Sequence, residues 1–216
     1  MTGITVKDIT QRFNRRTVLK DVNFTAEQGK VFGITGKNGS GKSTLVKIIS
    51  GIISPTKGSI AFTRNGEDIP SEKRHEHIGL VGPYLTLYEE FSALENLRFF
   101  HSIRGLKYDE QQSNELLARL DLPTDRSDPI AAYSSGMMQR MRFAFALLHD
   151  PAFLFLDEPT SNLDTDGKNK VHGIVRELSA ERCIIIATND YEDFVLCDDY
   201  YSVDGSVPAL LEQPAN

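Results

Sequence analysis

The segment GKNGSGKST at residues 36–44 places closely spaced glycines before a lysine and two hydroxyl side chains. It fits the pattern G-x-x-x-x-G-K-[S/T], in which glycines let consecutive backbone N–H groups turn toward a phosphate. The helix expected after the loop adds a partial positive charge. Lys42 would reach the β- and γ-phosphates of a nucleoside triphosphate, and the Ser43 hydroxyl would bind Mg²⁺. The residues expected to bind the phosphates are Gly36, Lys37, Asn38, Gly39, Ser40, Gly41, Lys42, Ser43 and Thr44.

Two adjacent carboxylates, Asp157 and Glu158, follow the apolar run FLFL at 153–156. A continuous apolar run of this kind predicts a buried strand. The carboxyl ends of strands in an open α/β sheet face the ligand crevice, so both carboxylates are expected beside the phosphates. Asp157 would hold Mg²⁺ through water, and Glu158 would polarise the attacking water as a general base. An exposed acidic turn is the alternative, but it does not explain why the pair ends an apolar strand.

Strands and helices alternate along the chain, which predicts an α/β fold with a parallel sheet. A short buried strand at 31–35 precedes the phosphate loop, and a helix follows it. Ser92 and Glu95 have the spacing of a capping box, which opens one helix, and residues 109–120 predict a second. Alternation of apolar and polar residues near the N-terminus predicts an antiparallel β subdomain.

These elements predict one domain with two lobes over residues 1–216. Residues 1–83 and 136–216 are expected to form the nucleotide-binding core together with the N-terminal β subdomain. Residues 84–135 are expected to form a mostly helical subdomain inserted into that core.

Four motifs share an order and spacing that resemble those of the ATP-binding cassette (ABC) ATPase domain. They are the phosphate loop, YSSGMMQR with the helix after it, LFLDEPTSNLD, and a strand that ends in ATND. The resemblance extends from Ile4 to about Asp204 and implies the P-loop NTPase core of that family, with a mixed or parallel sheet. The segment SALENLRFF and the unextended length look most like ATPase subunits of bacterial exporters, of the haem-exporter or the drug and antibiotic type.

The resemblance implies ATP and Mg²⁺ as cofactors, with ATP hydrolysis coupled to transport. It implies that two cassettes, identical or different, dimerise around two Mg-ATP and drive a separate integral membrane subunit. The protein is then expected to be cytoplasmic and peripheral, held at the inner face of the cell membrane by that subunit. A soluble ABC ATPase that acts on nucleic acid or ribosomes is an alternative.

Further site residues are implied by position in the family pattern. Phe13 stands where the family has an aromatic that stacks on adenine; a core Phe on an edge strand is the alternative. Ser134 and Gly136 are retained from the signature segment, whose helix N-terminus would face the γ-phosphate bound by the second copy. For Gln139 and Arg140, both a solvated helix face and a site role remain open.

Two positions depart from the family pattern. Pro83 replaces a Gln that contacts Mg²⁺ or water, and proline has no side-chain donor; Tyr84 and Thr86 are candidate substitutes. Asn189 replaces a His at the polar tip of the apolar strand 183–187. Its amide can donate to the γ-phosphate but cannot carry a proton, and capping of the next helix is a second role open to it. With Lys42, Ser43, Asp157 and Glu158 present, slow but genuine hydrolysis is expected, and an ATP-dependent clamp with little turnover is the alternative.

Composition excludes several other classes of protein. Apolar residues make up 40% and charged residues 25% of the 216, as in ordinary globular chains. A net charge of −6 argues against nonspecific binding to nucleic acid. No apolar run approaches the roughly 20 residues of a membrane-spanning helix, and no secretory signal is recognised. The two cysteines, Cys183 and Cys197, are expected to be reduced.

Overall fold

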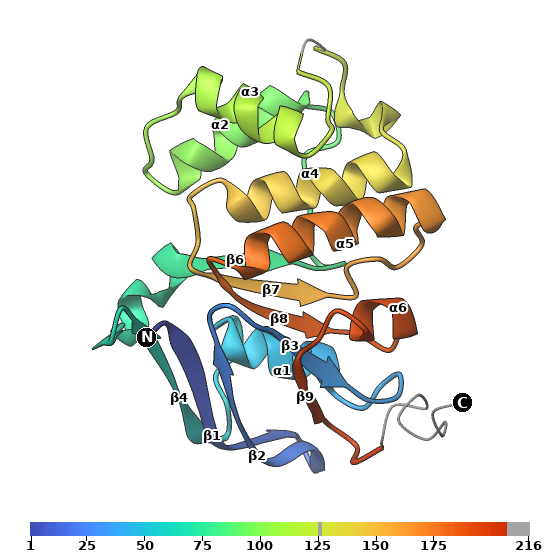
Figure 1. The fold of residues 1–216 in the computed structure, drawn as a ribbon. Helices are drawn as coiled ribbons and strands as arrows, with labels where there is room; N and C mark the ends of the chain where they lie inside the picture. The colour runs from blue at the N-terminus through green and yellow to red at the C-terminus, as the bar shows by residue number, and fades with distance from the viewer. Residues whose placement is uncertain (125–126, 207–216) are drawn as a thin grey trace.

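The computed structural model describes residues 1–124 and 127–206 as two sheets and the helices around them (Figure 1). The strands are β1 (Gly3–Phe13), β2 (Arg16–Glu27), β3 (Val31–Thr35), β4 (Lys57–Arg64), β5 (Glu67–Asp68), β6 (Ile78–Val81), β7 (Phe153–Asp157), β8 (Cys183–Ala187) and β9 (Asp199–Ser202). The α-helices are α1 (Lys42–Ile49), α2 (Ala93–Ile103), α3 (Glu110–Arg119), α4 (Ser135–Leu147), α5 (Thr165–Ser179) and α6 (Tyr191–Phe194). Short 3-10 helices cover Ser71–His77 and Ile130–Ala132.

The larger sheet has five strands in the order β6-β7-β8-β3-β9. All four of its strand pairs are parallel, which confirms the predicted parallel sheet. The smaller sheet, β2-β1-β4-β5, is antiparallel and confirms the expected N-terminal β structure. Figure 1 shows the carboxyl ends of β7 and β8 directed to the side of the molecule where the loop between β3 and α1 lies. The phosphate loop and the acidic strand ends therefore share one edge of the sheet.

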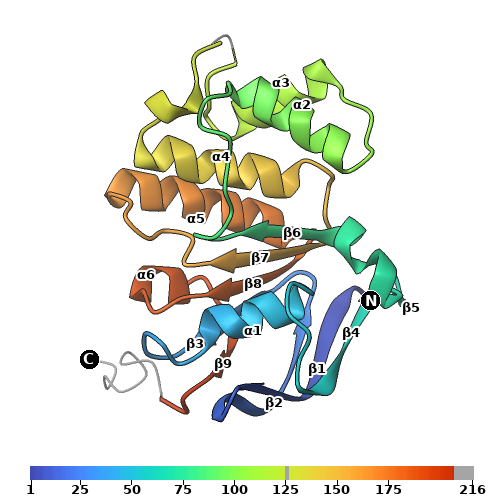
Figure 2. The same ribbon diagram turned by 180° about the vertical axis from the view of Figure 1, so that it is seen from behind.

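The parallel sheet separates two apolar cores, because successive side chains of a strand point to opposite faces. On β7, Leu154 and Leu156 belong to the core shared with α4 and α5, whereas Phe153 and Phe155 belong to the core shared with α1 and the antiparallel sheet. Figure 2 shows the same layering from behind, with α1 between the two sheets. Asp157 continues the alternation of Phe153 and Phe155, so its side chain faces α1.

The segment between β6 and α4 carries α2 and α3, as the sequence predicts. The capping box is confirmed: the Ser92 hydroxyl accepts from the Glu95 backbone N–H at 3.2 Å, and the Glu95 carboxylate accepts from the Ser92 N–H at 2.8 Å. Residues 125–126 of the predicted helical subdomain and 207–216 of the predicted core lie outside the described residues.

Candidate nucleotide site

Three glycines of the loop between β3 and α1 have a left-handed backbone, and at two of them, Gly36 and Gly41, a side chain would also clash with its surroundings. Gly36 has φ 142° and Gly41 has φ 115°. A Cβ on Gly36 would lie 2.7 Å from the Ser40 hydroxyl oxygen, and a Cβ on Gly41 would lie 2.9 Å from Val18 Cγ1. The loop is thus packed against β2 and its own turn, with Gly41 directly before the first residue of α1. Backbone N–H groups at a helix start in such a loop form an anion site.

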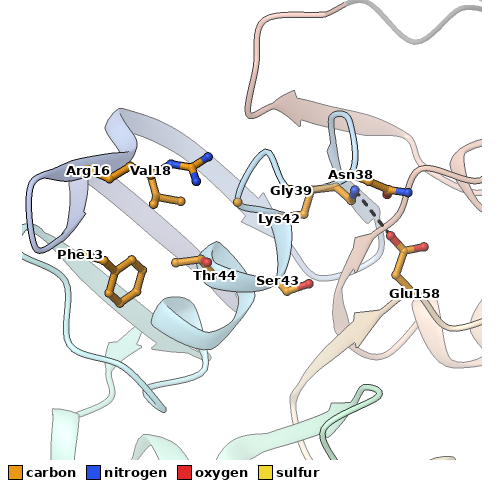
Figure 3. Close-up of a pocket in the computed structure, with 10 residues that line it drawn as sticks. Phe13, Arg16, Val18, Asn38, Gly39, Lys42, Ser43, Thr44 and Glu158 are labelled. Carbon is orange, nitrogen blue, oxygen red and sulfur yellow. Dashed lines mark ion pairs between the residues drawn. The ribbon is translucent and has the colours of Figure 1, made fainter.

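A pocket opens beside this loop (Figure 3). It is lined by Phe13, Arg16, Val18, Asn38, Gly39, Gly41, Lys42, Ser43, Thr44 and Glu158. The sequence did not predict that Arg16 and Val18 line this pocket. Their residue types alone do not show that the β1–β2 hairpin bends over the phosphate loop. Phe13 is 43% exposed, so the alternative of a core phenylalanine is wrong.

Lys42 points back into the loop and toward the acidic strand end. Its ammonium donates to the Gly36 carbonyl at 3.0 Å and lies 3.5 Å from Glu158 Oε1, the ion pair dashed in Figure 3. Lys42 is only 5% exposed, whereas Glu158 is half-buried. Burial raises the pKa of Glu158, and the Lys42 charge opposes that rise. A carboxylate with a raised pKa beside a phosphate loop is suited to accept a proton from water.

Glu158 leaves the end of β7 in an unusual backbone conformation, with φ 51°. Its backbone N–H donates to the Ala187 carbonyl at 2.8 Å, which ties the end of β7 to the end of β8. Left-handed conformations are uncommon outside glycine, and strain of this kind is concentrated at functional sites.

Ser43 and Asp157 meet across the sheet edge. The Ser43 hydroxyl donates to Asp157 Oδ1 at 3.1 Å. Asp157 is fully buried, and burial raises its pKa, with the Ser43 bond and the Lys42 charge acting in the opposite direction. Asp157 Oδ2 has no hydrogen-bond partner among the described residues. A hydroxyl and a carboxylate oxygen are ligands that Mg²⁺ prefers, so the residues present fit the predicted cation.

The polar tip of β8 lies next to the phosphate loop. The Asn189 amide donates to Asn38 Oδ1 at 2.8 Å. The alternative that Asn189 caps the following helix is wrong: Asp190 is the N-cap of α6, and its carboxylate accepts from the Glu192 N–H at 2.8 Å. The cap lies one residue further on because Asp190, not Asn189, precedes the first helical residue.

A buried carboxylate, Asp193, joins three segments behind the site. Its Oδ1 accepts from the Thr160 hydroxyl at 2.9 Å and contacts His172 Nε2 at 2.8 Å. Its Oδ2 accepts from the Thr188 hydroxyl at 3.0 Å. Thr160 follows Glu158 by two residues, and Thr188 directly precedes Asn189. Asp193 therefore holds the chain next to both of these site residues, a role that no sequence pattern indicated.

The signature segment lies apart from this pocket. Ser134 is the N-cap of α4, and its exposed hydroxyl accepts from the Met137 N–H at 3.2 Å. Neither Ser134 nor Gly136 is among the described residues that line the pocket. Gln139 and Arg140 are both buried, so the alternative of a solvated helix face is wrong. The Gln139 side chain donates to the carbonyl of Pro159, the residue after Glu158, at 2.7 Å. The Arg140 guanidinium donates to the Asp121 carbonyl at 3.2 Å.

Comparisons with known proteins agree with this geometry. A family model described as ABC transporter matches residues 19–161. The chain is 33% identical over 198 residues to the linearmycin resistance ATP-binding protein LnrL of Bacillus subtilis (strain 168), covering 89% of this chain and 63% of LnrL. It is 32% identical over 184 residues to the lantibiotic transport ATP-binding protein SrtF of Streptococcus pyogenes, covering 85% of this chain and 78% of SrtF. The chain thus spans less than two thirds of the length of LnrL.

Solved structures show the same fold. The structure of an ATP binding subunit of an ABC transporter superposes with a TM-score of 0.78 at 28% identity, covering 92% of this chain and 85% of that one. The chain therefore belongs to the ABC transporter family, as an ATP-binding protein with that family's P-loop fold. In residues 1–124 and 127–206, no helix has the length and apolar character needed to cross a membrane.

Proposed function

We propose that the chain binds and hydrolyses ATP as the nucleotide-binding subunit of an exporter-type ABC transporter. The convergence of the phosphate loop with the acidic end of β7 supports this most directly. There Ser43 lies 3.1 Å from Asp157 and Lys42 lies 3.5 Å from Glu158. The resistance and lantibiotic-transport names of LnrL and SrtF support the exporter type.

Each residue has a distinct task in the proposed hydrolysis. Backbone N–H groups of residues 36–44 bind the phosphates, and Lys42 exchanges its contact with the Gly36 carbonyl for phosphate oxygens. Glu158 accepts a proton from the attacking water, which its raised pKa favours. Ser43 and Asp157 would hold Mg²⁺, whose positive charge would offset the negative charge of the phosphates. Phe13, exposed at the rim of the pocket, stacks on the adenine.

The proposed active form contains two cassettes, either identical or different. Ser134 and Gly136 stand at the N-terminal end of α4 and do not line their own chain's pocket. A helix N-terminus binds anions, so a second cassette placed head to tail would supply these residues to the γ-phosphate. Two Mg-ATP would then lie between the two chains.

A separate membrane subunit is the proposed second partner, and residues 84–135 are the proposed helical subdomain that contacts it. Tyr88, Phe91 and Phe99 form a partly exposed aromatic cluster there, with the Tyr88 and Phe99 ring centroids 4.8 Å apart. Exposed Glu89 and Glu90 lie within the same loop. This surface suits a short apolar or basic helix of a membrane protein, which would hold the chain at the cytoplasmic face.

Hydrolysis is expected to be slow because of two replacements. Pro83 is exposed and has no side-chain donor, and Asn189 is held by Asn38 and cannot carry a proton. The same two residues support the second candidate function, an ATP-dependent clamp with little turnover.

Comparison of the wild type with Glu158→Gln separates the two functions. Loss of a general base costs about 10²- to 10⁴-fold in rate, so phosphate release should fall by at least about a hundredfold while ATP affinity is retained. Glu177→Gln, an exposed glutamate in an ion pair with Arg119, is the matched control and should keep the wild-type rate. Equal phosphate release by wild type and Glu158→Gln would support the clamp and refute hydrolysis.

A further inference from the structure

The loop after β6 turns back over the end of its own strand. A Cβ built on Gly82 would lie 2.9 Å from Tyr84 Cζ and 3.2 Å from the Tyr84 hydroxyl oxygen. The phenol of Tyr84 therefore fills the space that a side chain at residue 82 would occupy. Only glycine at position 82 leaves this space open.

The sheet register places that space beside Asp157. Val81 pairs with Leu156 in the parallel β6–β7 ladder, so the next residues, Gly82 and Asp157, are neighbours at the ends of the two strands. Paired residues of parallel strands point to the same face, and neighbouring strands are about 4.8 Å apart. The Tyr84 hydroxyl, which substitutes for a side chain at residue 82, therefore lies on the same face as the Asp157 carboxylate and next to it.

Both groups still need a hydrogen-bond partner. The Tyr84 hydroxyl and Asp157 Oδ2 are each out of contact with solvent, and neither has a partner among the described residues. Native structures satisfy nearly all such buried polar atoms. A tyrosine hydroxyl keeps its proton at neutral pH, so it can donate a hydrogen bond as well as accept one.

The ring of Tyr84 is fixed from the side of α1. The Lys47 ammonium lies 4.4 Å from the ring centroid, a cation–π contact from the helix that also carries Ser43. Thr86, the other candidate substitute for the missing Gln, is exposed, as is Pro83. Of these three residues, Tyr84 alone combines a buried donor with a position beside Asp157.

We propose that Tyr84 is a positioning residue of the magnesium site, where its hydroxyl and Asp157 Oδ2 together hold a water of the cation's hydration shell. This role rests on the proposed function, because it requires that Ser43 and Asp157 hold Mg²⁺ when ATP is bound. Tyr84, the residue after Pro83, would thereby supply the polar contact to Mg²⁺ or water that Pro83 cannot make.

The test is Tyr84→Phe, which removes the hydroxyl and keeps the ring. Tyr108→Phe is a matched control: the Tyr108 hydroxyl is also buried without a partner among the described residues, and its ring lies 4.8 Å from Arg98 Cζ. Tyr108 differs from Tyr84 in its place, because it lies in the loop between α2 and α3, where its ring packs against His101 of α2. The protein is titrated with ATP in a calorimeter at a series of Mg²⁺ concentrations. The result is the Mg²⁺ concentration at which half of the protein binds ATP tightly. Outer-shell partners typically change metal affinity by about 10- to 100-fold.

We expect Tyr84→Phe to raise that concentration roughly tenfold, with ATP binding in EDTA and the melting temperature both unchanged. Gly82→Ala, which displaces the phenol, should shift it in the same direction, and Tyr108→Phe should match the wild type. A Tyr84→Phe protein with the wild-type Mg²⁺ dependence would overturn the role of Tyr84 while leaving the proposed function intact. A wild type that binds no Mg-ATP would refute both, and the two results are therefore distinguishable.

Discussion

Asp193 offers the sharpest test of how the fold supports the site, through the substitution Asp193→Ala. The carboxylate is fully buried and receives hydrogen bonds from Thr160 at 2.9 Å and Thr188 at 3.0 Å, with His172 at 2.8 Å. Alanine would leave these three partners without their acceptor. His172 is 14% exposed and can turn to water, but the two threonines are each 1% exposed and cannot.

The expected loss of stability follows from those two hydroxyls. A buried donor left without a partner costs about 1–3 kcal/mol, so two cost roughly 2–6 kcal/mol. Removal of a buried carboxylate returns part of its desolvation cost. We therefore expect Asp193→Ala to lower the free energy of unfolding by about 3 kcal/mol. Asp193→Asn keeps the shape and one carbonyl oxygen, so it should cost about 1 kcal/mol.

Urea unfolding, followed by circular dichroism, measures the free energy of unfolding of both variants. The comparison with the wild type requires that the slope of this free energy with urea concentration is unchanged. Glu177→Ala breaks the exposed ion pair with Arg119, and this control should cost less than about 1 kcal/mol. Asp193→Asn should also slow ATP hydrolysis, because Thr160 and Thr188 stand beside Glu158 and Asn189. An unfolding free energy of Asp193→Ala within about 0.5 kcal/mol of the wild type would refute this reasoning.

Three further predictions concern the pocket itself. Phe13→Ala should weaken ATP binding about tenfold in calorimetry, since stacking of a base on an aromatic contributes about 1–3 kcal/mol; an unchanged affinity would place the adenine elsewhere. Asn189→His should leave ATP binding intact and preserve or raise the hydrolysis rate, and a tenfold loss would show that Asn189 acts in another way. Burial raises the folded-state pKa of Asp157, so its ionised form destabilises the nucleotide-free chain above that pKa. Asp157→Asn should therefore raise the melting temperature at neutral pH. The gain should shrink as the pH falls through the folded-state pKa and vanish below about pH 3, where the carboxyl is protonated in both states; a gain that persists there would contradict this cause.

Local sequence patterns were sufficient for much of the fold and for the phosphate loop. The glycines at 36 and 41 predicted a loop that only glycine can form, and both have positive φ. The apolar runs before Asp157 and Thr188 predicted two buried strands, and every residue of β7 and of β8 is indeed buried. These predictions succeed because each depends on residues close together in the chain.

Features that depend on packing between distant segments were not accessible to the sequence. Gln139 and Arg140 are polar residues on a helix, and only the contacts of α4 with Pro159 and Asp121 show that they are buried. In the sequence, Asp193 looks like any polar residue of a helix. Its role becomes visible only in the fold, where Thr160 and Thr188 donate hydrogen bonds to its carboxylate. The choice between Tyr84 and Thr86 likewise depended on which hydroxyl turns inward.

Calorimetric titration of the purified wild type with Mg-ATP, beside Lys42→Ala, tests the central claim most directly. We predict one nucleotide bound per chain. Binding by Lys42→Ala should be at least about tenfold weaker, because a hydrogen bond from a charged group contributes about 1.5–3 kcal/mol. A wild type that releases no heat with Mg-ATP, or a Lys42→Ala protein that binds it equally well, would contradict the claim that residues 36–44 bind a nucleoside triphosphate.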